Sequence, residues 1–85
     1  MDRNEYYRAC MRMTEELAPT ISPKYRGMVT THDAAGAWDQ AVTTLVGALS
    51  EEDVPVTEAQ KETLRRIYEY LGQPMNYLNE IRIRL

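Results

Sequence analysis

Two side chains of this 85-residue chain could perform nucleophilic catalysis, Cys10 and His32, and each is the only residue of its type. A histidine beside a cysteine can accept the thiol proton and leave a reactive thiolate. Cys10, however, falls on an apolar stripe with helical spacing, where cysteine behaves as a small hydrophobic side chain. No obvious nucleophile neighbours His32 in the sequence, and no motif supplies an oxyanion hole. We therefore expect a protein that is not an enzyme, with no catalytic residues.

The sequence also lacks the ligand patterns of common metal sites. One cysteine and one histidine are too few for a zinc site of the usual composition. Carboxylates alone could hold Mg²⁺ or Ca²⁺, but the acidic run Glu51-Glu52-Asp53 lacks the glycine and the ligand spacing of an EF-hand loop. We expect neither a metal ion nor any other cofactor.

The strongest feature of the sequence is its distribution of charge. The segment 29–63 has seven acidic residues and one base, Lys61, within a chain whose formal net charge is −3. The acids are Asp33, Asp39, Glu51, Glu52, Asp53, Glu58 and Glu62. A negative field of this kind attracts a basic partner and speeds its encounter. The same residues could instead form a solvated surface, and composition alone leaves both interpretations open.

A weaker pattern suggests nucleic-acid binding. Lys61, Arg65 and Arg66 share a predicted helix that follows another helix and a loop, as in a helix-turn-helix. The N-terminus of such a helix should face the bases, but here it carries Glu58 and follows an acidic loop. Phosphate repulsion would oppose docking. A small nucleic-acid-binding or transcriptional regulator is therefore the alternative to a protein-binding function.

Hydrophobic periodicity and capping signals predict the first two helices of the chain. Residues 3–17 read as an amphipathic helix that Ala18-Pro19 ends. Ser22-Pro23 then opens a second, short helix over 22–32. Gly27 and the β-branched residues after it disfavour that helix, so a distorted turn is nearly as compatible with the sequence.

The third helix, over 34–49 with Asp33 as its cap, is predicted to be the centre of the fold. Its apolar stripe consists of Trp38, Ala41, Val42, Leu45 and Leu49. The opposite side carries neutral residues, two of them glycines: Gly36, Gln40, Thr43 and Gly47. A glycine inside a helix costs roughly 1 kcal/mol relative to alanine, so we expect something to pack closely against this side. That could be another part of the domain, or a partner such as a second copy of the chain.

The remaining segments complete a single domain, residues 1–85. A capping box at Thr57 and Gln60 opens a fourth helix over 58–71, and Gly72 is suited to end it. A last short helix is predicted over 74–80, followed by an alternating segment, 81–85, with no strand to pair with. The predicted fold class is all-α, a compact four-helix bundle with a short fifth C-terminal helix and an extended tail.

Two features bear on the compartment. A single cysteine cannot form an intramolecular disulfide, which is typical of a reducing environment. The sequence lacks both the apolar stretch of a secretory signal and a run of about 20 apolar residues that would span a membrane. We expect a cytoplasmic protein with no membrane partner.

A longer pattern covers about residues 32–78. It consists of the run Ala35-Gly36-Ala37-Trp38-Asp39-Gln40-Ala41, then Leu45, Leu49, Glu51-Glu52, Val54-Pro55-Val56-Thr57 and Leu71-Gly72. This pattern resembles that of small bacterial immunity proteins, and it most resembles the MafI-type family, whose members neutralise cognate polymorphic toxins. The resemblance implies an inhibitor inside the cell that occupies the active-site or substrate cleft of a toxin domain.

The acidic segment and the resemblance together predict where a partner would bind. The predicted contact residues are the acids that flank the third helix, with two tyrosines as aromatic anchors: Asp33, Asp39, Glu51, Glu52, Asp53, Tyr70 and Tyr77. Tyrosine is common among the residues that dominate interface energies. The expected partner is a toxin domain with a basic cleft and not a nucleic acid. A homodimer through Gly36, Gln40, Thr43 and Gly47 is the remaining alternative.

Overall fold

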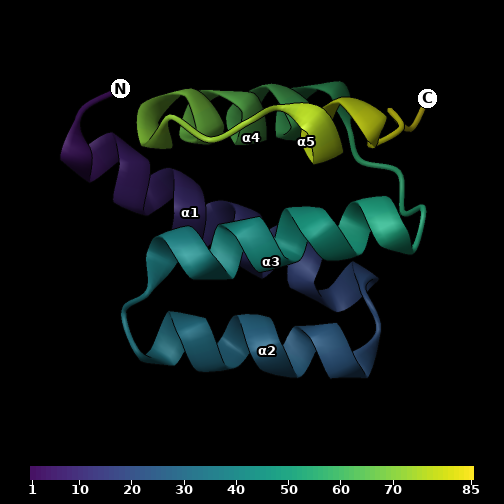
Figure 1. The fold of residues 1–85 in the computed structure, drawn as a ribbon, viewed down its shortest axis with the longest axis horizontal. Helices are drawn as coiled ribbons and strands as arrows, with labels where there is room; N and C mark the ends of the chain where they lie inside the picture. The colour runs from purple at the N-terminus through teal and green to yellow at the C-terminus, as the bar shows by residue number, and fades with distance from the viewer.

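Five α-helices and one turn of 3-10 helix make up most of the chain in the computed structural model, which describes residues 1–85 (Figure 1). In chain order they are α1 (Arg3–Leu17), η1 (Ala18–Thr20), α2 (Pro23–Ala34), α3 (Trp38–Glu51), α4 (Glu58–Leu71) and α5 (Asn76–Glu80). The all-α class predicted from the sequence is confirmed.

Helices α1 and α4 have the bounds that the sequence predicts, because each begins and ends at a clear local signal. The Asp2 side chain accepts a hydrogen bond from the Glu5 backbone N–H at 2.8 Å and so caps α1. At the start of α4 both hydrogen bonds of the capping box between Thr57 and Gln60 are present. Gly72 ends α4 in the left-handed conformation, with φ of 69°.

The junction between α2 and α3 differs from the prediction. The second helix is regular and continues to Ala34, so Asp33 lies inside α2 and does not cap α3. Gly36, with φ of 74°, follows α2, and the backbone N–H of Ala37 donates to the His32 carbonyl at 2.9 Å. These are the features of a Schellman motif, in which a glycine ends a helix. The start predicted for the third helix was therefore wrong, and Gly36 is not on α3.

Helix α3 is the centre of the fold, as predicted. It packs against α1, α2 and α5, and it lies between α2 and the layer formed by α4 and α5 (Figure 1). Its fully buried side chains are Ala41, Val42, Leu45, Val46, Ala48 and Leu49. Trp38 is only partly buried, at the edge of the core, so the predicted stripe was wrong at that position.

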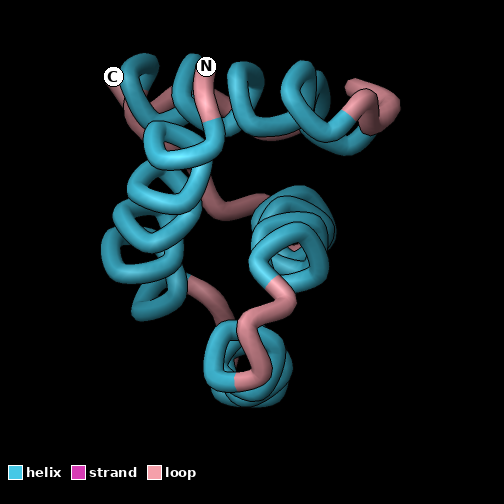
Figure 2. The backbone as a smooth tube through the Cα atoms, turned by 90° about the vertical axis from the view of Figure 1, so that its left-hand side faces the viewer, coloured by secondary structure: helices cyan, strands magenta, loops and turns pink.

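The helices do not confirm the predicted four-helix bundle. Helices α2 and α3 form an antiparallel pair that Figure 2 shows nearly end-on, whereas α1 and α4 run across that direction. Helix α4 packs mainly on α1 and α5. The result is a layered arrangement of helices around α3.

The C-terminal tail lies on the body of the protein, as predicted, and it does find a pairing partner. Val56, in the loop before α4, forms a single parallel bridge with Ile83. The Val56 backbone N–H donates to the Arg82 carbonyl at 2.9 Å, and the Arg84 N–H donates to the Val56 carbonyl at 2.6 Å. Ile81 is buried, but 41% of Ile83 remains exposed. The alternating pattern therefore anchors the tail through one apolar side chain.

Gly47, inside α3, and Gly72, at the end of α4, should respond in opposite ways to replacement by alanine. A Cβ at Gly47 would meet no atom within 4 Å, so of the two alternatives left open by the sequence, close packing by another part of the domain is absent at this position. Gly47→Ala should therefore stabilise the protein by about 1 kcal/mol. Gly72→Ala should destabilise it by about 1 kcal/mol, because φ of 69° disfavours a Cβ. Urea unfolding followed by circular dichroism measures both, and destabilisation by Gly47→Ala would mean that this face is packed in solution.

Candidate functional site

The acids predicted as contact residues fall into two groups at opposite ends of α3. Asp39 lies in its first turn, close to Asp33 at the end of α2, and Glu51 is its last residue, followed by Glu52 and Asp53. A rise of 1.5 Å per residue separates Asp39 from Glu51 by about 18 Å. The two groups therefore form two surfaces rather than one patch.

Two of the predicted acids contact other parts of the chain. The Glu52 carboxylate accepts a hydrogen bond from the Ser22 backbone N–H at 2.8 Å, and the hydrogen bonding from Ser22 lowers the pKa of Glu52. Asp53 pairs with Arg82 of the tail at 2.8 Å. Glu52 thus accepts a hydrogen bond from the backbone N–H of the residue that precedes α2, and Asp53 pairs the loop before α4 with the C-terminal tail. The sequence could not reveal these roles, because each contact joins residues about 30 positions apart.

Glu51 differs from its two neighbours, because it borders a hollow in the surface between α2, α3 and α5. This hollow has a volume of about 580 Å³ and is lined by Tyr25, Thr44, Gly47, Ala48, Ser50, Glu51, Tyr77 and Glu80, which we call the Gly47 groove. A second hollow of about 340 Å³ adjoins it and shares Gly47 and Tyr77. The open face of α3 beside Gly47 is therefore a groove and not a flat surface.

The polar groups of the Gly47 groove have defined orientations. The Tyr25 hydroxyl donates a short hydrogen bond to the Glu51 carboxylate, which raises the pKa of Tyr25. The Ser50 hydroxyl donates to Glu80 at 2.9 Å. Tyr77 is 64% exposed, as expected of an anchor. Glu80 was missed by sequence reasoning, although its position three residues after Tyr77 places both on one side of α5.

The other end of α3 carries a cluster of aromatic rings. The Tyr70 ring stacks on Tyr6 with centroids 4.8 Å apart, and Tyr7 lies 5.4 Å from Tyr6 and 6.0 Å from Trp38. Tyr6 is buried and Tyr70 is 43% exposed. Tyr70 therefore belongs to this cluster, beside the start of α3, whereas Tyr77 belongs to the Gly47 groove.

Cys10 has the properties of a buried hydrophobic side chain. It is completely inaccessible to solvent, and burial raises its pKa to about 11. The Cys10 thiol is therefore protonated at neutral pH and is not activated as a nucleophile. His32 lies on α2, partly exposed, and no hydrogen bond joins it to Cys10.

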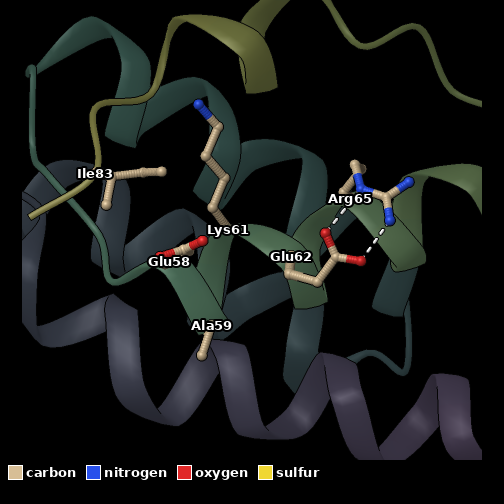
Figure 3. A pocket seen from close by; sticks show the side chains of 6 residues that line it. All are labelled: Glu58, Ala59, Lys61, Glu62, Arg65 and Ile83. Carbon is tan, nitrogen blue, oxygen red and sulfur yellow. Dashed lines mark hydrogen bonds and ion pairs between the residues drawn. The ribbon is translucent and has the colours of Figure 1, made fainter.

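The cations on α4 have partners within the protein. Arg65 forms ion pairs with Glu62 and Glu69, as Figure 3 shows for Glu62. The Lys61 ammonium group donates to the Ile81 carbonyl at 2.7 Å. This side of α4 borders an open hollow of about 750 Å³ lined by Glu58, Ala59, Lys61, Glu62, Arg65 and Ile83 (Figure 3). Two of its charged residues are acids and two are bases, so the surface offers little net attraction for phosphate.

Arg66, the third cation of the suggested recognition helix, lies 3.7 Å from the Glu5 carboxylate.

No group of three or more potential metal-binding side chains forms, and no helix is long and apolar enough to cross a membrane. No protein-family model, curated protein or solved structure matches the chain.

Proposed function

We propose that this protein is an immunity protein, which binds a basic toxin domain in the cytoplasm of the cell that produces it and blocks the toxin's activity. The observation that carries the proposal is the uncompensated charge around α3. Of the five acids predicted to make contact, only Asp53 forms an ion pair. No lysine or arginine occurs between Val29 and Gln60 that could neutralise the others.

Such a surface suits a partner with a basic cleft. Enzymes that act on RNA, DNA or nucleotides present positive charge to phosphate groups, and an acidic protein can occupy the same site. The resemblance of residues 32–78 to the MafI-type immunity proteins supports the same class of function. The compensated cations of α4 do not favour a nucleic-acid partner, so we propose a protein partner.

Co-expression tests this function. The C-terminal domain of the protein encoded immediately upstream should arrest the growth of a bacterial host when it is produced alone. Production of the present chain in the same cells should restore growth, and the two proteins should purify as a 1:1 complex. Continued growth arrest in cells that contain the folded chain would contradict the proposal.

A further inference from the structure

We infer that the Gly47 groove binds an arginine side chain of the partner, with its guanidinium group against the Tyr77 ring and the carboxylates of Glu51 and Glu80. The inference rests on the proposed function for the identity of the partner. The chemistry of the groove can nevertheless be examined separately, because an arginine peptide can stand in for the partner.

Unpaired negative charge is the first argument. Neither Glu51 nor Glu80 forms an ion pair, and no lysine or arginine lines the groove. Each carboxylate accepts one hydrogen bond from a hydroxyl group, of Tyr25 or of Ser50, and retains further lone pairs that can accept. The hydroxyl groups orient the carboxylates, whose remaining lone pairs are exposed and open to donors from a ligand. A cation supplies the strongest donors for two carboxylates.

The exposed aromatic wall is the second argument, and it favours arginine over lysine. Tyr77 is 64% exposed and stands between the two adjoining hollows. A guanidinium group can stack on an aromatic face and donate in its plane to carboxylates, whereas an ammonium group lacks this planar geometry. The Tyr25 ring already has the Lys24 ammonium group 5.6 Å from its centre, so Tyr77 is the ring available for an incoming cation.

The third argument is the open glycine in the floor of the groove. Gly47 lies inside α3, its backbone is not left-handed, and a Cβ there would meet no atom. Nothing within the chain therefore requires glycine at this position, although glycine weakens the helix. The space left open joins the hollows of about 580 Å³ and 340 Å³. A side chain at this position would fill the passage through which a partner's backbone could approach.

A peptide titration tests the inference. The probe is a blocked hexapeptide with one arginine among glycines and serines, added to the ¹⁵N-labelled protein and followed by NMR. The amide signals of Gly47, Glu51 and Tyr77 should shift and saturate. A lysine analogue should bind more weakly, and a citrulline analogue, which keeps the shape without the charge, should leave these signals unchanged.

Matched variants test whether peptide binding depends on the acids of the groove or on the total negative charge of the protein. Glu51→Gln with Glu80→Gln should weaken binding of the arginine peptide about tenfold. The control pair Glu15→Gln with Glu58→Gln removes two exposed acids that form no ion pair, and it should leave the binding unchanged. Gly47→Leu should abolish binding. Gly27→Leu, at a second open helical glycine, should not.

Several results would overturn the inference. These are the absence of groove shifts with the arginine peptide, equal shifts with the citrulline analogue, and equal losses in the test and control pairs. Groove shifts that depend on protein concentration without peptide would identify a second copy as the occupant. If co-expression restores growth equally well with the Glu51→Gln, Glu80→Gln variant, the inference about the groove is wrong and the proposed function is retained. If the peptide binds in the groove but the chain fails to restore growth, the proposed function is wrong and arginine binding by the groove is retained.

Discussion

Replacing Leu45 with alanine is expected to lower the free energy of unfolding by about 3–4 kcal/mol. Leu45 is completely buried in α3, the helix that packs against three others, so little backbone movement can fill the cavity. The total stability expected for a domain of this size is about 4–13 kcal/mol. The loss is therefore a large fraction of the total stability, and urea unfolding followed by circular dichroism measures it.

Trp38→Ala is the matched comparison, because it removes a larger side chain from the edge of the same core. The ring is only partly buried and packs against Tyr7, so its removal should cost about 1–2 kcal/mol. A greater loss from Trp38→Ala than from Leu45→Ala would show that the aromatic cluster, and not the middle of α3, is the centre of the fold.

The second large effect concerns binding. Replacing both Asp39 and Glu51 with lysine should lower the affinity for the basic toxin domain at least about tenfold at low salt. The loss should shrink as salt rises, because ions screen the attraction that the reversal removes. Neither acid forms an ion pair, and the one hydrogen bond lost, from the Tyr25 hydroxyl to Glu51, is exposed. The free energy of unfolding should therefore change by less than about 1 kcal/mol. Titration calorimetry at two salt concentrations measures the effect.

The control for this reversal is Glu15→Lys with Glu58→Lys, which changes the net charge equally on α1 and α4. This variant should bind the toxin domain almost as well as the unaltered protein. Equal losses in the two pairs would mean that total charge, and not the surface around α3, governs binding. Glu52 and Asp53 are unsuitable for either pair, because their reversal should also loosen α2 and the tail.

Local signals predicted much of the fold. The capping box at Thr57 and the left-handed glycine at 72 defined α4 to the residue, because their hydrogen bonds lie within one turn of the chain. The α2–α3 junction was predicted less well, because Asp33 and Gly36 carry competing signals. An aspartate can begin a helix and a glycine can end one, and here the glycine prevailed while α3 began without a side-chain cap.

The candidate site depended more on long-range contacts. The sequence predicted Tyr77 as an aromatic anchor and placed the acids around the third helix, since neither prediction depends on a long-range contact. The groove itself requires α5 to return beside α3, where Glu80 meets Ser50. The structural roles of Glu52 and Asp53 likewise depend on Ser22 and Arg82. No local pattern encodes such pairs, so the sequence could not separate anchoring acids from free ones.

Amide hydrogen exchange of the protein, alone and in complex with the toxin domain, tests most directly whether the acidic surface around α3 makes the contact. The account predicts slower exchange in the complex at the two ends of α3 and over α5, which carries Tyr77 and Glu80. The outward faces of α1 and α4, with their arginines, should exchange as in the free protein. Protection confined to α1 and α4, with α3 and α5 unchanged, would contradict it.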